Sequence, residues 1–430
     1  MMKNNVKNLI EFIDHSPSCF HVIENAKKQF LEHGFTELKE KEYWDLEEGK
    51  SYFVTRNGSS MIAFHLPKKD FQGFHIVASH SDSPTYRIKE QPEMSVEKHY
   101  TKLNIERYGG MIPETWFDRP LSVAGRIIIE ENGQIKDQLV NIDRDLMIIP
   151  NLAIHMSRSS SESKQLNPQK DLLPLCGGNL TKNGFEEMIA KESGVEKEDI
   201  LSYDLFLYNR MRGTTLGINE EFVAAPKLDD LECAYSSIEG MLNAKLSKDY
   251  VTVCAVFDNE EVGSGTKQGA GSTFFPEVLK RISYLCGKNE EEYYMAVADS
   301  FMLSADNAHA VHPNYQDKTD PTNRPYINEG IVLKYNASQK YTTDANSAAL
   351  VKYLCKKEKI HCQVFFNRSD MLGGSTLGNI LTGQVSIKAA DIGLPQLSMH
   401  STYETAGCKD LDDMITLMKS FYELGKEVQI

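Results

Sequence analysis

The chain lacks several features that would place it in familiar protein classes. It has no apolar run approaching the about 20 residues that cross a membrane. Its first residues, MMKNNVKNLIEFIDHS, carry acids where a secretory signal has an apolar stretch. Its eight cysteines form no C-x-x-C pair, so we interpret them as small buried residues in a reducing compartment. We therefore expect a soluble, cytoplasmic protein.

Basic charge is also scarce. The 47 Lys and Arg residues are outnumbered by 61 Asp and Glu residues, giving a net charge of −14. This balance disfavours nucleic acid and anionic membranes as partners. The P-loop pattern and H-E-x-x-H are absent, Gly269 comes one residue too late for a dinucleotide-binding G-x-G-x-x-G, and 373–377 fails the G-x-S-x-G elbow at its last position.

The periodicity instead indicates an α/β fold with an insertion. At about 150 residues per domain, 430 residues suggest two or three domains. Both ends of the chain alternate helical and apolar strand patterns, which is typical of a sheet with helices on both faces. The middle is rich in short β-like runs. We expect a mixed-sheet α/β catalytic domain formed by residues 1–90 and 225–430, with a β-rich domain inserted at 91–224.

Individual elements follow from the same patterns. Residues 51–65 and 293–300 are predicted as strands. Asn132-Gly133 is predicted to be the turn of a hairpin. The polar, serine-rich segment 157–171 is predicted to be a mobile loop. The last helix is predicted over 410–428, with Asp410 as its N-cap.

The most informative stretch is 251–265, VTVCAVFDNEEVGSG. A β-branched, apolar run ends in adjacent carboxylates, Glu260 and Glu261, followed by glycines. Adjacent carboxylates at a strand end repel each other unless a positive charge lies nearby, and a metal ion supplies that charge. One glutamate could then bind the metal while the other serves as a base. The alternative is a solvated acidic turn after a strand.

Four other apolar-to-polar junctions also offer a His or an Asp. With the glutamates, the junctions carry His80, Asp229, Glu260/Glu261, Asp306 and His400. Sites in α/β proteins form at the carboxyl ends of strands, and two His with three carboxylates suit a pair of Zn²⁺-like ions with one bridging carboxylate. Glu260 is left over as the base. Taken alone, a strand-end His is more often structural, and Asp230 is a good helix N-cap.

These residues lie in motifs that together resemble the M18 metallopeptidases, the aspartyl aminopeptidases. The resemblance spans essentially the whole chain. The motifs, in the family's order, are SHSDSP (79–84), TWFDRPLSVAGR (115–126), NLAIH (151–155), PKLDD (226–230), FDNEEVGSG (257–265), SADNAHAVHPNY (304–315) and LSMHS (397–401).

The resemblance implies a role for each site residue. The expected roles are one metal held by His80 and Asp306, a second held by Glu261 and His400, Asp229 bridging both, Glu260 as general base and Asp82 supporting His80. The two divalent ions are expected to be Zn²⁺, although such ligands also accept Co²⁺ or Mn²⁺. Because related dinuclear enzymes have a cis peptide after the bridging aspartate, we predict one at Asp229–Asp230.

The resemblance also implies a substrate and an assembly. The substrate would be a peptide with an acidic N-terminal residue, and the subunits would form a homo-oligomer, a tetrahedral dodecamer built through the inserted dimerisation domain. His155 is expected to reach the substrate of a neighbouring subunit, or else to be an ordinary interface residue. Lys334 would suit an acidic side chain, or else be a surface lysine. His309 is a third candidate for substrate binding.

The chain departs from the family pattern at three places: Cys19 stands where a proline is usual, 402–403 reads Thr-Tyr for Ile-Arg, and 367–374 has a different shape. These differences leave the metal ligands alone but put a strict Asp/Glu preference in question. Two rival interpretations therefore stay open. The site could act on a non-peptide amide as a metal-dependent amidohydrolase or deacylase, or the chain could be an inactive shell-forming protein.

Overall fold

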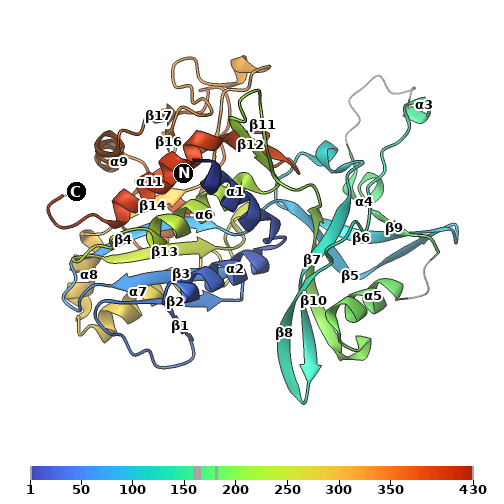
Figure 1. The fold of residues 1–430 in the computed structure, drawn as a ribbon, viewed down its shortest axis with the longest axis horizontal. Helices are drawn as coiled ribbons and strands as arrows, with labels where there is room; N and C mark the ends of the chain where they lie inside the picture. The colour runs from blue at the N-terminus through green and yellow to red at the C-terminus, as the bar shows by residue number, and fades with distance from the viewer. Residues whose placement is uncertain (1, 158–165, 180–182, 429–430) are drawn as a thin grey trace.

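The computed structural model describes residues 2–157, 166–179 and 183–428 and is built around a nine-stranded mixed sheet (Figure 1). In spatial order its strands are β1 (Thr36–Leu38), β2 (Lys50–Arg56), β3 (Ser60–Leu66), β13 (Val251–Phe257), β4 (Phe74–His80), β14 (Phe301–Ala305), β18 (Lys388–Gly393), β16 (Ile331–Lys334) and β17 (Cys362–Phe365). The mixed α/β class predicted from the sequence is confirmed.

Helices cover both faces of this sheet. On one face the core includes residues of α1 (Met2–Asp14), α2 (Cys19–Glu32), α6 (Leu228–Leu242), α9 (Ala345–Glu358) and α11 (Cys408–Tyr422). On the other it includes α7 (Phe274–Leu285), α8 (Glu290–Ala298) and α10 (Leu377–Gln384). Every residue of β4, β13 and β14 is buried, as expected for strands packed on both sides. In the part of the chain that the structure describes, none of these helices is long and apolar enough to cross a bilayer.

A six-stranded antiparallel sheet stands beside the first one. Its strands, in spatial order, are β8 (Gln134–Asn141), β7 (Leu121–Glu131), β10 (Ile200–Asn209), β5 (Thr85–Val96), β6 (Tyr100–Tyr108) and β9 (Leu175–Gly177). It has its own apolar core, closed by α5 (Gly184–Ser193). The predicted hairpin is confirmed, with Asn132 and Gly133 at φ values of 55° and 74° between β7 and β8. The exact domain limits 1–90, 91–224 and 225–430 stay a prediction.

A third, five-stranded sheet brings together segments far apart in sequence. It runs β11 (Thr214–Leu216), β12 (Phe222–Ala225), β20 (Glu404–Gly407), β19 (Pro395–Leu397) and β15 (Ala308–His309). Ala225 is paired with Glu404 across β12 and β20. This pairing places the start of α6 beside the loop that carries His400.

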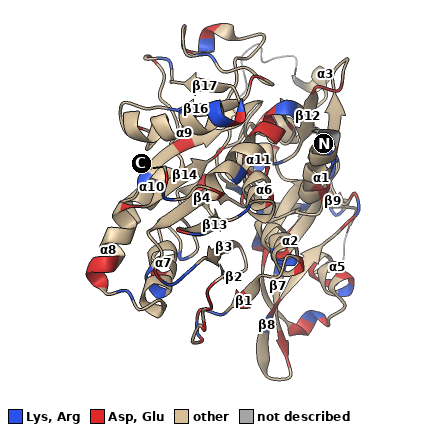
Figure 2. Cartoon of the chain, turned by 60° about the vertical axis from the view of Figure 1, so that its left-hand side comes forward, with Lys and Arg blue, Asp and Glu red and all other residues tan. Residues whose placement is uncertain are grey.

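Two strand predictions were wrong. Residues 51–65 form two antiparallel strands, β2 and β3, because Asn57 and Gly58 make a turn with positive φ between them. Residues 293–300 lie mostly in helix α8, which begins with a capping box between Asn289 and Glu292. Figure 2 shows acidic residues at the start of α8, where carboxylates stabilise the helix N-terminus.

Two further predictions need correction. Asp410 does not cap α11, because Gly407 occupies that position and Asp410 is buried in the first turn. Its carboxylate accepts hydrogen bonds from the main-chain N–H groups of Asn328 and Gly330. The loop predicted at 157–171 ends in a short helix, α4 (Pro168–Asp171), and its residues 158–165 lie outside the described part of the chain.

Candidate metal centre

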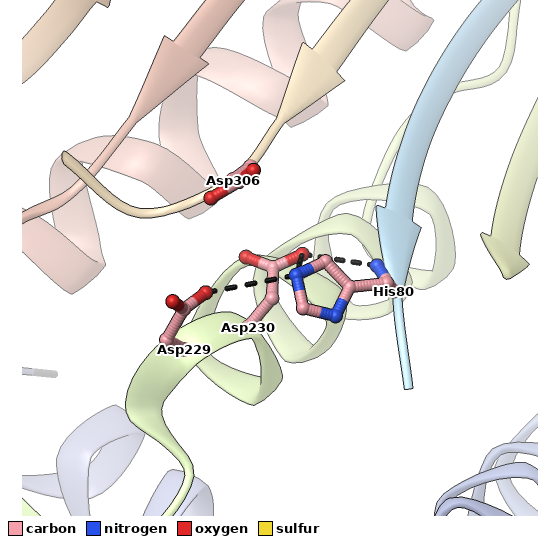
Figure 3. A group of neighbouring side chains, drawn as sticks. All are labelled: His80, Asp229, Asp230 and Asp306. Carbon is pink, nitrogen blue, oxygen red and sulfur yellow. Dashed lines mark hydrogen bonds and ion pairs between the residues drawn. The ribbon is translucent and has the colours of Figure 1, made fainter. Parts of the chain in front are cut away.

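Chemically active side chains converge where the central strands of the nine-stranded sheet end. β4 is parallel to both β13 and β14, and Phe257 is the neighbour of His80. His80 therefore ends its strand beside the glutamates that follow β13, while Asp306 follows β14 and Asp229 comes from the start of α6. Figure 3 shows His80, Asp229, Asp230 and Asp306 facing a common space. One potential ligand atom from each of these four lies within 4.8 Å of the others.

Asp229 lies between the two histidines predicted as ligands. Its Oδ1 is 3.6 Å from Nε2 of His80, and its Oδ2 is 3.3 Å from Nε2 of His400. His400 Nε2 is also 3.3 Å from Oε1 of Glu261. Asp229, Glu261 and His400 thus form a second group whose ligand atoms lie within 4.8 Å of one another. One carboxylate is shared by two clusters, as a bridging ligand must be.

The donor set fits metal ions. Asp229 is buried, yet its Oδ1 has no hydrogen-bond partner. A buried carboxylate oxygen without a partner is costly unless a cation or water satisfies it. Imidazole nitrogens combined with carboxylate oxygens are the ligands that zinc accepts.

The main chain after Asp229 has the predicted form. The Asp229–Asp230 peptide bond is cis. Asp230 does not cap α6. It lies buried within the span Leu228–Leu242, and its Oδ2 accepts a hydrogen bond of 3.0 Å from the main-chain N–H of His80.

Asp82 connects His80 to the paired glutamates. Its Oδ1 is 3.4 Å from Nδ1 of His80 and accepts the main-chain N–H of Glu260 at 3.1 Å. Its Oδ2 accepts the N–H of Glu261 at 3.2 Å and the hydroxyl of Tyr108 at 2.7 Å. Asp82 is buried, and Tyr108 comes from β6 of the six-stranded sheet.

Crowding of carboxylates changes their pKa values. Burial raises the pKa of Glu260 to about 8; His80 opposes this rise and the negative charge of Asp306 adds to it. Burial and the neighbouring Asp229 hold the pKa of Glu261 well above its usual range. Burial also raises the pKa of Asp229, but the nearby imidazoles of His400 and His80 outweigh it and lower that pKa. The site is therefore short of positive charge, which a bound cation would supply.

The three residues predicted to bind substrate occupy different settings. Lys334, at the end of β16, is buried, and its Nζ donates to the main-chain oxygens of Asp306 and Asn307 at 2.7 and 3.1 Å. His309 lies on β15 with its side chain exposed. His155 is exposed on α3 (Ile154–Ser157), which Figure 1 shows at the outer end of the molecule, away from β4 and α6. The chain thus brings the predicted ligands together but leaves His155 distant.

The positions that depart from the family pattern contact other parts of the chain. The Thr402 hydroxyl donates to the main-chain oxygen of Thr115 at 2.8 Å, and the Tyr403 hydroxyl donates to that of Arg212 at 2.7 Å. Both bonds fasten the loop after His400 to segments that adjoin the six-stranded sheet. Cys19 begins α2 and has a raised thiol pKa, caused first by burial and then by Asp258.

Sequence reasoning missed Glu404. This residue is buried, and its carboxylate accepts hydrogen bonds from the main-chain N–H groups of Asp229 and His400. Its agreement with the last residue of the S-I-R-E stretch found in many relatives was the available signal, and an acidic residue in a loop does not by itself indicate burial.

A mixed α/β fold with carboxylates and histidines converging at strand ends defines a class of metal-dependent hydrolases. The comparisons with known proteins identify the family within that class. The family model described as "Aminopeptidase I zinc metalloprotease (M18)" matches residues 12–422. The chain belongs to this family of zinc-dependent aminopeptidases, which hydrolyse peptides at their N-terminus.

Similar proteins match nearly the whole length of the chain. The chain is 46% identical to "Probable M18 family aminopeptidase 2" of Clostridium novyi (strain NT), across 98% of this chain and 100% of that relative. Among solved structures, "Cryo-EM structure of the Ape4 and Nbr1 complex" matches with a TM-score of 0.94 and 36% identity, covering 98% of this chain and 86% of that one. "Structure of S. cerevesiae mApe1 dodecamer" matches with a TM-score of 0.84 and 26% identity, covering 97% and 96%.

Proposed function

We propose that this aminopeptidase works through a dinuclear metal centre and favours peptides with an acidic N-terminal residue. The observation that carries the dinuclear proposal is the Asp229 carboxylate, whose two oxygens face His80 and His400 at 3.6 and 3.3 Å. His80 and Asp306 would hold one ion, and Glu261 and His400 the other, with Asp229 shared. Zn²⁺ follows from the family, and the same ligands accept Co²⁺ or Mn²⁺.

Glu260 is the proposed general base. When bound, the metal ions make a water molecule more acidic and polarise the scissile carbonyl. Glu260 takes the proton of the attacking water and later gives it to the leaving amine. The main-chain N–H of Glu260 donates a hydrogen bond to Asp82. This bond fixes the main chain from which the Glu260 side chain extends.

Substrate recognition is assigned to Lys334, His309 and His155. An ammonium group has three N–H donors, and two of those on Lys334 already meet main-chain oxygens. The Nζ also lies 3.6 Å from Oδ1 of Asp306, so a substrate carboxylate would compete with Asp306 for the third N–H. His155 is proposed to act on the substrate of a neighbouring copy in a homo-oligomer. A tetrahedral dodecamer is the proposed assembly, supported by the relative whose title names a dodecamer.

A substrate panel tests this proposal. The metal-loaded enzyme is offered anilides of Asp, Glu, Leu and Lys, each with a free and with an acetylated amino group. We expect turnover of the free Asp and Glu substrates and none of the acetylated ones. Preferred cleavage of acetylated substrates would favour the amidohydrolase or deacylase alternative. No turnover with full metal content would favour the inactive shell protein.

A further inference from the structure

Each proposed metal ligand is held at its main chain by a buried ionisable side chain that is not itself a proposed ligand. The N–H of His80 donates to Asp230, the N–H of Glu261 to Asp82, and the N–H groups of Asp229 and His400 to Glu404. At the fifth ligand, Asp306, donor and acceptor are exchanged: its main-chain carbonyl oxygen accepts a hydrogen bond from the ammonium group of Lys334. Each of these hydrogen bonds is made by a buried side chain, so together they fix the position of the main chain from which each ligand extends.

Glu404 differs from the other acceptors in what it joins. Asp82 accepts from Glu260 and Glu261, which are adjacent in sequence. Glu404 instead joins Asp229 and His400, two residues that are far apart in the sequence. Its Oε2 accepts a hydrogen bond of 3.0 Å from the N–H of Asp229, and its Oε1 accepts one of 2.7 Å from the N–H of His400. The same two residues approach each other at their side chains, with 3.3 Å between Asp229 Oδ2 and His400 Nε2.

We infer that Glu404 is a positioning residue that sets the spacing between Asp229 and His400, and through it the affinity of this half of the site for its metal ion. This inference rests on the proposed dinuclear centre. Glu404 begins β20, and β20 pairs with β12 through Glu404 and Ala225. The strand pairing therefore holds the carboxylate in place, and the carboxylate in turn holds the two ligands. The five-stranded sheet is thereby connected to the proposed metal centre through Glu404.

The test replaces Glu404 by Gln and counts bound Zn²⁺. The amide side chain offers one acceptor oxygen and places an N–H donor where the second acceptor stood, so one ligand amide loses its partner. We expect the Zn²⁺ ion held by Glu261 and His400 to bind about 10- to 100-fold more weakly, the range for outer partners of metal ligands, and the ion held by His80 and Asp306, which shares only Asp229 with it, to be weakened less. Chelator competition with metal analysis measures both affinities without any assay of activity.

Two matched controls separate positioning from general stability. Glu93 on β5 also accepts two main-chain N–H groups, from Asn183 at 2.8 Å and Phe185 at 2.5 Å. Glu93→Gln therefore makes the same substitution in the same arrangement within the six-stranded sheet. Asp410→Asn does so at a buried carboxylate that accepts from Asn328 and Gly330. Both are expected to leave Zn²⁺ affinity unchanged, whatever they do to the unfolding temperature.

A second variant guards against simple misfolding. Glu404→Asp keeps both acceptors but is one methylene shorter, so it cannot reach both amides at their present spacing. We expect it to weaken the same ion, and we expect excess Zn²⁺ to restore turnover in either variant. Unchanged affinity for both ions in Glu404→Gln, or equal losses in the controls, would overturn the inference alone. A wild-type enzyme that binds a single Zn²⁺ would instead contradict the dinuclear centre on which the inference rests.

Discussion

The nine-stranded and six-stranded sheets use their strands in different ways. Every residue of β4 and β13 is buried, whereas β5 and β8 mix buried with exposed positions along their length. A strand covered by helices on both faces has little room for polar chemistry along its length. The chemistry of the nine-stranded sheet is therefore concentrated where its strands end, at His80, Glu261 and Asp306. The other two proposed ligands, Asp229 and His400, follow strands β12 and β19 of the five-stranded sheet.

The six-stranded sheet contributes support to the site. Tyr108 reaches across to donate to Asp82 and to accept from the Asn259 side chain at 2.8 Å. None of the metal-binding groups found among the described residues includes a side chain from this sheet. The helix-covered sheet thus carries side chains that face the site, while the six-stranded sheet supports the site through Tyr108 and leaves part of its surface exposed.

The largest expected effect is in the helix-covered part. Glu260→Ala should lower kcat by about 10²- to 10⁴-fold, the usual contribution of a general base, while two metal ions stay bound. Steady-state kinetics with metal analysis checks both.

The contrasting variant is His155→Ala on α3, which should mainly raise KM if a neighbouring copy supplies this residue. For comparison, an unchanged kcat in Glu260→Ala would refute the role of Glu260 as general base.

A smaller effect concerns stability against pH. His75 on β4 is buried against the ring of Tyr250, with 4.0 Å between ring centroids, and burial lowers its pKa to about 3. The unfolded chain takes up the proton near pH 6.5 and the folded chain does not, so stability falls as pH drops from 6.5 toward 3. The slope is about 1.4 kcal/mol per pH unit.

Two histidine variants, one in each region, test this pH dependence of stability. His75→Phe keeps an aromatic ring, and His75 Nδ1 has no hydrogen-bond partner to lose. Urea unfolding at pH 6.5 and 5 should show a stability difference about 2 kcal/mol smaller in this variant than in the wild type. The exposed His155→Gln should behave as the wild type does. Equal pH dependence in all three proteins would contradict the buried, neutral state of His75.

The sequence was most informative where a local pattern determined the structure. The apolar runs of β4 and β13 predicted buried strands, and the polar residues after them predicted where the site would form. Asn132-Gly133 predicted its hairpin because two residues with positive φ suffice to define such a turn. The other strand-end ligands then left Glu260 as the base, and the family resemblance implied the same division of roles between Glu260 and Glu261.

Local patterns failed where distant contacts decide. Residues 293–300 are apolar enough for a strand, but the preceding Asn289 and Glu292 cap a helix instead. Asp230 and Asp410 each stand near the start of a helix, yet both are buried acceptors of main-chain N–H groups from elsewhere. Glu404 comes close to Asp229 only when β20 pairs with β12. No spacing in the sequence encodes that contact.

The number and position of the metal ions test the central claim most directly. Crystals of the Zn²⁺-loaded enzyme, measured on both sides of the zinc absorption edge, would locate each ion by its anomalous signal. The account predicts two peaks, one beside His80 and Asp306 and one beside Glu261 and His400, with the Asp229 carboxylate in contact with both. A single peak, or an Asp229 carboxylate turned away from either ion, would contradict it.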